Sequence, residues 1–226
     1  MKIAIHQPEH LPYLGFMYKM SQCDIFVLLD DVQFQKNGFQ NRNRIKTSQG
    51  AQWVTVPVLH SFGQKINEVR IDNKSDWKRK HLQSIQANYA QAPYFKKYFP
   101  LLQEIYSRPW NELCELNITL IQFFTQELGI KEKIVRSSSL IKTGEKNELL
   151  ISICKNLNAT SYLSGMGAAY LDVTLFLKNK IEVEYTIFKH PEYPQGYTPF
   201  LSNMSTLDLL MNCGPLSGNI LRGSSP

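Results

Sequence analysis

The chain has 226 residues, of which 43% are hydrophobic and 19% are charged, so it is long enough for one domain with a buried core. The formal net charge of +6 mildly favours anionic partners and does not by itself indicate a nucleic-acid-binding protein. The start, MKIAIHQPEH, turns polar after five residues and no long apolar run follows. We therefore expect a cytoplasmic protein without membrane insertion. Its four widely spaced cysteines lack a CxxC pair, which is unlike the spacing of a zinc site.

The first part of the chain predicts a strand, a helix and a second strand. KIAIH (2–6) is a short apolar strand, and LPYLGFMYKMSQ (11–22) has apolar residues at helical spacing after a proline that suits a first turn. DIFVLLDD (24–31) is a continuous apolar run that ends in two acids, which is typical of a buried parallel strand. This succession indicates a βαβ unit.

The middle of the chain has a different pattern. QWVTVPV (52–58) and INEVRID (66–72) alternate between apolar and polar residues, and the turn residues between them predict a hairpin. Helical spacing follows over three further stretches, about 75–90, 95–106 and 111–128. We interpret about 75–128 as a mostly helical insertion.

Strands and helices alternate again in the last third of the chain. We expect strands at 132–138, 160–165 and 181–188, and helices at 144–159, 169–180 and 201–214. The predicted fold class is therefore α/β, a three-layer domain with a parallel sheet over residues 1–214 that carries the helical insertion. Residues 215–226 are expected to be a flexible tail.

Polar residues crowd the turn HQPEHLPYLG (6–15) directly after the first predicted strand. At the carboxyl end of a parallel strand, His6, Gln7 and His10 would face the crevice where α/β proteins bind ligands. A histidine pair can hold phosphate oxygens and move protons near neutral pH. The alternative is structural: Glu9 and His10 cap the next helix, and His6 is a core residue.

Two acids, Asp30 and Asp31, end the second predicted strand on the same edge as His6. One of them can bind Mg²⁺, an amine or a ribose hydroxyl, or act as a base, while the other can simply cap. Three serines, Ser137, Ser138 and Ser139, close a later strand, where serines either bond a nucleotide or cap a helix.

The stretch FQNRNRIKT (39–47) concentrates amide and cationic donors. If it is extended, Asn41 and Asn43 face one way and Arg42 and Arg44 the other. Guanidinium and ammonium groups match phosphate or carboxylate, so we expect an anion clamp formed by Asn41, Arg42, Asn43 and Lys46. The alternative is a solvated hairpin.

Two further groups complete the candidate substrate-binding residues. YLSGMGAAY (162–170) places Ser164, Gly165 and Gly167 after a strand, where glycine lets a ligand approach the backbone. HPEYPQ (190–195) holds His190 and Gln195 in an unusually polar loop, and Ser205 and Asp208 share one face of the last predicted helix.

Several of these motifs together resemble the WbqC-like family. They are IHQPEHLPYLGF, DIFVLLDDVQF, QNRNRIKT, the W-x-x-K-H of DWKRKH, YLSGMGAAYL and STLDLLMNCG, and they span about residues 3–214. The resemblance implies a role in surface-polysaccharide (O-antigen-type) biosynthesis, in which an amino sugar or sugar nucleotide is made or modified.

A weaker likeness links QPEHLPY after the first strand to the HxGH signature of nucleotidylyltransferases, whose histidines hold the phosphates of ATP. Pro12 replaces the glycine and Tyr13 the second histidine, and no lysine lies in SNMST, which would correspond to the second signature. The likeness implies a nucleotidylyltransferase-like fold more strongly than nucleotidyl transfer itself.

The function we expect is that of a transferase with a phosphate-handling site for a nucleotide or sugar nucleotide. His6 or His10 would be general base or acid, and Asp30 would orient the attacking group or a metal; Mg²⁺ is the one cofactor that these residues suggest. The group moved would be acyl, aminoacyl or nucleotidyl. The alternative is a non-catalytic binding protein of the same pathway. Nucleic acid is not an expected partner, because no basic stripe with interleaved aromatics is evident.

Overall fold

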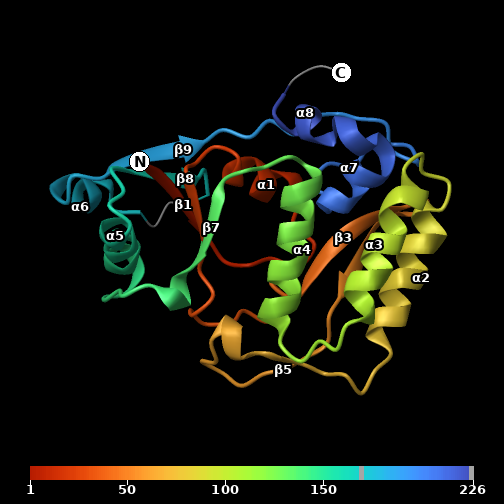
Figure 1. Ribbon diagram of the computed structural model, residues 1–226, viewed down its shortest axis with the longest axis horizontal. Helices are drawn as coiled ribbons and strands as arrows, with labels where there is room; N and C mark the ends of the chain where they lie inside the picture. Colours follow the sequence, from red (N-terminus) through yellow and green to blue (C-terminus); the bar gives the residue numbers. More distant parts are fainter. Residues whose placement is uncertain (168–170, 224–226) are drawn as a thin grey trace. The chain divides into compact units, whose positions relative to one another are not determined.

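A computed structural model describes residues 1–167 and 171–223 (Figure 1). Contacts divide the chain into two compact units. The first unit comprises Met1–Gln7, Tyr18–Asp31 and Lys131–Lys189, and the second comprises Pro8–Met17, Val32–Ile130 and His190–Pro226. The chain therefore leaves the first unit and returns to it twice before it ends in the second.

The first unit contains a five-stranded sheet in the order β7-β2-β1-β8-β9, and every neighbouring pair is parallel. The strands are β1 (Lys2–His6), β2 (Ile25–Leu28), β7 (Lys133–Arg136), β8 (Ser161–Gly165) and β9 (Glu182–Thr186). All five lie within predicted strands, so the predicted α/β class with a parallel sheet is confirmed.

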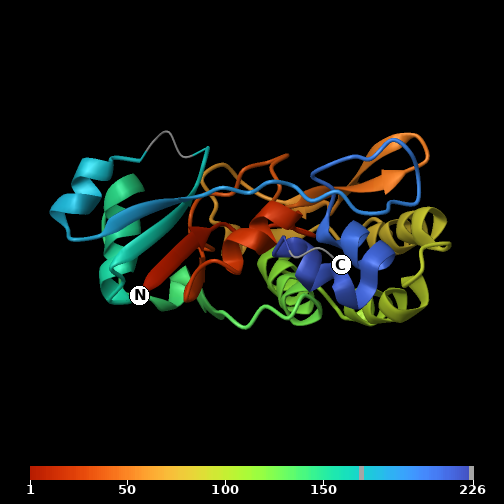
Figure 2. The same cartoon turned by 90° about the horizontal axis from the view of Figure 1, so that it is seen from above.

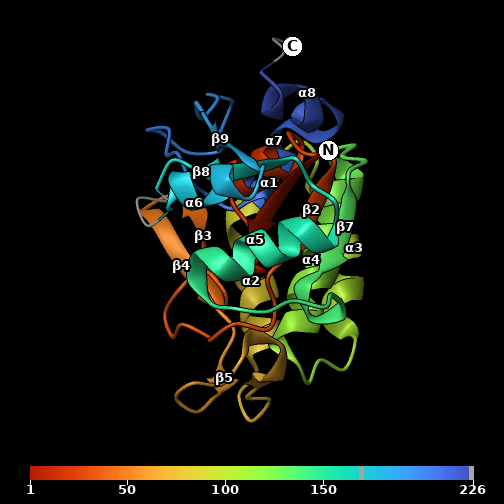
Figure 3. The ribbon, with the colours of Figure 1, turned by 90° about the vertical axis from the view of Figure 1, so that its left-hand side faces the viewer.

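The three central strands of this sheet, β2, β1 and β8, are buried on both faces, as a continuous apolar run predicts for β2. Ile3, Ile5 and Val27 belong to one core cluster with residues of α5 (Lys146–Asn156) and α6 (Val173–Lys178), and Figure 3 shows α5 lying across this part of the unit. The alternate side chains, such as those of Ala4 and Phe26, are fully buried as well. The apolar residues whose spacing predicted these strands and helices are thus the ones that the core buries.

The second unit holds two small antiparallel sheets. β3 (Arg42–Thr47) pairs with β4 (Gly50–Thr55), and β5 (Val58–Leu59) pairs with β6 (Arg70–Ile71). The predicted hairpin between 52–58 and 66–72 is therefore mostly wrong, because β4 uses its hydrogen bonds on β3. Of the stretch 52–58, only Val58 pairs with the stretch 66–72, where it lies opposite Ile71.

The predicted helices of the insertion are confirmed, and all of them lie in the second unit. They are α2 (Trp77–Tyr89), α3 (Phe95–Ser107) and α4 (Leu113–Glu127). The helix predicted at 11–22 is shorter, α1 (Leu14–Met20), and the one predicted at 201–214 is α7 (Thr206–Cys213). None of the helices in the described residues combines the length and the apolar character that crossing a membrane requires.

The predicted flexible tail needs correction. A single 3₁₀ turn leads into α8 (Ser217–Leu221), in which Ser217 and Leu221 are buried. Gly218 packs so closely on the Leu128 carbonyl that a Cβ there would clash. The end of the chain as far as Gly223 is therefore ordered by packing that composition alone did not reveal.

Candidate functional site

The strand order of the first unit has a reversal point between β1 and β8. The chain starts at β1, proceeds to β2 and β7 on one side, and then returns to β8 and β9 on the other. Ligands of open α/β sheets bind outside the carboxyl ends of the strands at such a point. The register Ala4↔Leu163 places His6 level with Gly165, so the candidate residues His6, Gln7, Ser164 and Gly165 come together there.

His6 ends β1 as a neutral imidazole. Burial, together with the positive charge of Lys19, lowers the pKa of His6 from 6.5 to about 4. Its Nδ1–H donates to the Gln7 carbonyl oxygen at 3.0 Å, and in this tautomer Nε2 carries the lone pair. A neutral imidazole can accept a proton at Nε2, and the lowered pKa makes it a weaker base than a solvated histidine.

Lys19 is a residue that the sequence analysis missed. It lies in the last turn of α1, is only 6% exposed, and donates from Nζ to the Ile5 carbonyl oxygen at 2.9 Å. A lysine in the last turn of a helix is ordinarily solvated, so no sequence signal distinguishes this one. Its burial next to β1 brings a cation to the same strand end as His6.

Space is free beside the two glycines at the end of β8. A Cβ at Gly165 or Gly167 would have no atom within 4 Å, whereas Ser164 is buried and donates to the Gly165 carbonyl oxygen at 3.3 Å. Glycine there leaves room for a ligand to approach the backbone. The predicted passage from this turn into a helix includes residues 168–170, which lie outside the described residues.

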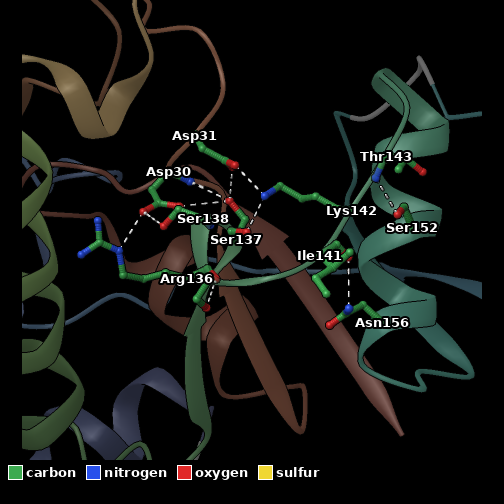
Figure 4. A network of polar contacts seen from close by, with 11 residues as sticks. Asp30, Asp31, Arg136, Ser137, Ser138, Ile141, Lys142, Thr143, Ser152 and Asn156 are labelled. Carbon is green, nitrogen blue, oxygen red and sulfur yellow. Dashed lines mark hydrogen bonds and ion pairs between the residues drawn. The ribbon is translucent and has the colours of Figure 1, made fainter.

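A polar network joins the ends of β2 and β7 at the same edge of the sheet (Figure 4). Asp30 is fully buried and accepts hydrogen bonds from Arg136 Nε at 2.7 Å, from Ser138 N at 2.9 Å and Oγ at 2.8 Å, and from Ser137 Oγ at 3.1 Å. Burial raises the pKa of Asp30, but the bonds from Ser138 and Arg136 outweigh it and leave that pKa below its usual value. Asp30 is thus a carboxylate surrounded by donors.

Asp31 belongs to the same network. Its carboxylate forms an ion pair with Lys142 and accepts from the Ser137 hydroxyl (Figure 4). Ser137 and Ser138 therefore bond carboxylates rather than capping a long helix, while Ser139 Oγ donates to the Arg136 carbonyl oxygen at 2.7 Å. No group of three or more His, Cys, Asp or Glu that could hold a metal occurs in residues 1–167 and 171–223. The catalytic role predicted for Asp30 stays a prediction.

His10 lies in the second unit and is wholly buried. Its Nδ1 is 3.1 Å from Asn117 Oδ1, and its ring centroid is 5.7 Å from that of His81. Burial and the neighbouring His81 lower the pKa of His10 from 6.5 to about 3, and burial lowers that of His81 to about 4. His81 Nε2 bonds the Thr55 carbonyl oxygen at 3.0 Å.

The predicted anion clamp is extended, and its residues alternate as expected. Asn41 and Asn43 are buried: Asn41 Nδ2 donates to the Val56 carbonyl oxygen at 3.0 Å, and Asn43 Oδ1 accepts from the Arg44 amide at 2.9 Å. Lys46 is also buried and donates to the Pro199 carbonyl oxygen. Arg42 is the clamp residue that keeps an appreciable exposed fraction, so the four side chains do not share one solvent-facing surface.

Gln195 contributes to a buried network around Asp208. Asp208 accepts from Tyr89 OH at 2.8 Å, from Tyr193 OH at 2.8 Å and from Gln195 Nε2 at 2.7 Å. Burial raises the pKa of Asp208 above its usual value, although these three donors oppose the shift. His190 stacks near Tyr193, with ring centroids 6.2 Å apart. The network secures the 190–201 segment, which runs beside the β3–β4 hairpin (Figure 2).

Comparison with known proteins adds the family. A sequence model of the WbqC-like protein family matches residues 7–220. The chain belongs to the WbqC-like family. An uncharacterized protein of Mycobacterium tuberculosis (strain ATCC 25618 / H37Rv), Rv1507c, is 35% identical to this WbqC-like protein over 226 residues, which cover 98% of this chain and 97% of that protein. No solved structure matches it.

Proposed function

We propose that this WbqC-like protein is a transferase of surface-polysaccharide biosynthesis that modifies an amino sugar or a sugar nucleotide. The observation that carries the proposal is the strand order, because its reversal point brings His6, Gln7, Ser164 and Gly165 to one strand edge. The donor or acceptor phosphates would lie over the open backbone at Gly165 and Gly167, with the Lys19 ammonium as a nearby positive charge.

In this proposal His6 is the general base. The attacking amine or hydroxyl of the acceptor gives its proton to His6 Nε2 as the new bond to the transferred group forms, and the leaving group departs with the electron pair of the broken bond. The Gln7 carbonyl oxygen accepts from Nδ1–H and so holds the His6 ring in the tautomer whose Nε2 carries the lone pair. Positioning and charge stabilisation would supply most of the rate.

The group transferred is acyl, aminoacyl or nucleotidyl. The position of HQPEHLPY at the end of the first strand of a parallel sheet supports a nucleotidylyltransferase-like relationship. Pro12 replaces the glycine of the nucleotidylyltransferase signature and Tyr13 replaces its second histidine. These replacements favour acyl or aminoacyl transfer instead. The His10 ring also argues against nucleotidyl transfer, because it is buried and bonds Asn117 within the second unit.

Binding can be tested with a thermal-shift panel of ATP, CoA and UDP-, GDP- and dTDP-sugars, each with and without Mg²⁺. A ligand at 100 times its Kd adds about 2.7 kcal/mol, or roughly 5–10 °C in Tm for a chain of this size. Gly165→Ala has space for its methyl group in the free protein, so we expect an unchanged Tm without ligand and a diminished shift with it. No shift with any compound would contradict the proposal.

Turnover separates a transferase from the alternative, a non-catalytic binding protein of the same pathway. With the ligand identified by the panel, His6→Gln should keep the thermal shift and lose transfer by about 100-fold or more, as expected for removal of a general base. A protein that binds the ligand but transfers nothing, with His6 present or replaced, would favour the binding protein.

The charge state of His6 is a second test, independent of turnover. Because the Lys19 ammonium contributes to lowering the pKa of His6, Lys19→Met should raise that pKa, although burial will keep it below 6.5. We expect NMR of labelled histidine to show His6 no more than about 10% protonated at pH 5 in the native protein, and a larger protonated fraction at the same pH in Lys19→Met. Lys2→Met, which removes a charge at the opposite end of β1, is the matched control. Identical spectra for all three proteins would show that Lys19 does not act on His6.

A further inference from the structure

The β3–β4 hairpin exposes two aromatic rings. Trp53 is 42% exposed and Phe39, just before β3, is 43% exposed, and their ring centroids are 6.0 Å apart. Large aromatic side chains usually gain more by burial, so a pair that stays in solvent is a candidate contact surface. The buried residues of the same hairpin, such as Ile45 and Val54, show that its other face packs inward.

Two guanidinium groups lie over the indole ring. Arg42 Cζ lies 4.3 Å from the centroid of the Trp53 ring, and Arg44 Cζ lies 5.6 Å from it. The register explains this arrangement, because Arg44 is directly opposite Trp53 and Arg42 is two residues further along the same face of β3. We call Phe39, Arg42, Arg44 and Trp53 the hairpin platform.

The hydrogen-bond partners of the two platform arginines are backbone carbonyl groups. Arg42 donates to the Asn37 carbonyl oxygen and Arg44, at 3.4 Å, to the Asn203 carbonyl oxygen, and neither pairs with a carboxylate within the described part of the chain. The surrounding sequence has no Asp or Glu at all between residues 32 and 67, while it has five Lys or Arg residues. The local charge therefore suits an anionic ligand.

We propose that the hairpin platform binds single-stranded nucleic acid. Bases stack on Trp53, Phe39 and the guanidinium planes, and the phosphates pair with Arg42 and Arg44, which is the usual combination in sequence-tolerant single-strand binding. A free nucleotide suits this surface less, since small ligands are normally enclosed in a concave site. An anionic glycan would supply negative charge for the arginines, but its sugar rings are not planar and cannot stack on the aromatic side chains as bases do.

This activity is separate from the proposed transferase function, which uses residues of the first unit. It also revises the expectation that nucleic acid is not a partner. Trp53 lies nine residues from Arg44 in the chain, so a linear reading separates it from the basic stretch, and the hairpin pairing is what brings it beside the arginines.

The test is binding of 5′-fluorescein octauridylate, followed by fluorescence anisotropy at 50 mM salt. Trp53→Ala should weaken binding by about 5- to 150-fold, the range that loss of one stacked base gives, and Trp53→Phe should restore much of it. Because Trp53 is exposed, its replacement should leave Tm unchanged, which circular dichroism can check. Failure to bind the oligonucleotide, or equal binding by all three proteins, would overturn the proposal.

Salt dependence isolates the phosphate contacts. Arg42→Gln should reduce the slope of log K against log salt by about 0.7, the value for one single-strand phosphate contact. Lys80→Gln, which removes the same charge from the exposed face of α2, should leave the slope nearly unchanged. Heparin serves as the glycan probe: if it binds at least as tightly as the oligonucleotide and loses affinity equally in Trp53→Ala, the ligand class is wrong.

Discussion

Replacing Asp208 by alanine is expected to lower the free energy of unfolding by at least about 3 kcal/mol. The carboxylate is fully buried and accepts from Tyr89, Tyr193 and Gln195, so its removal strands three polar donors in the interior. Each buried donor left without a partner costs about 1 kcal/mol or more. The loss of packing around the removed carboxylate adds to this cost.

Urea denaturation of Asp208→Ala measures this effect, with Asp208→Asn as an intermediate variant. The asparagine keeps one accepting oxygen but faces the remaining donors with an amide group, so we expect a smaller loss. Glu192→Ala removes an exposed carboxylate from the same 190–201 segment and should change stability by less than about 0.5 kcal/mol. A loss below about 1 kcal/mol in Asp208→Ala would mean that the network does not stabilise the second unit.

The same network has a local consequence. Tyr193 and Gln195 tie the 190–201 segment to α7, and Lys46 ties it to β3 through Pro199. In Asp208→Ala, we therefore expect the amide of Leu201, which bonds Gln195 Oε1 at 2.9 Å, to lose hydrogen-exchange protection before the amides of α4 do.

Lowering the pH from 7 to 5 is expected to destabilise the protein by about 4 kcal/mol through His10 and His81 alone. Their pKa values are about 3 and about 4 in the folded protein, against about 6.5 when unfolded. Between those values the unfolded chain binds more protons than the folded one, so stability falls as the pH falls below 6.5. Over this pH range each histidine contributes about 2 kcal/mol, and the loss from each levels off below its folded pKa.

Urea denaturation at pH 7 and pH 5 can separate this contribution from that of other groups. His10→Gln and His81→Gln should each reduce the pH-dependent loss by about 2 kcal/mol, whatever their stability at pH 7. Lys80→Gln, next to His81 but on the exposed side of α2, should show the native pH dependence. If both histidine variants lost as much stability on acidification as the native protein, the two rings would not be neutral in the folded state.

Local patterns were sufficient for most of the secondary structure. Continuous apolar runs such as DIFVLLDD predicted β2 as a buried parallel strand, and helical spacing predicted α2, α3 and α4 to within a few residues. These predictions succeed because a residue's periodicity depends on the chain beside it. Parallel pairing also brought the residues at the ends of β1 and β8 to one edge, as expected of a βαβ succession.

The tertiary structure alone decided which residues meet. Alternation predicted that 52–58 is a strand but does not specify its partner, which proved to be β3 rather than 66–72. Asp30 meets Arg136 across 106 positions, and His10 meets His81 across more than 70. Composition and spacing describe how polar a segment is. Which donor faces which acceptor depends on through-space packing between distant segments. This packing buries Lys19 beside β1 and places two guanidinium groups over the Trp53 ring.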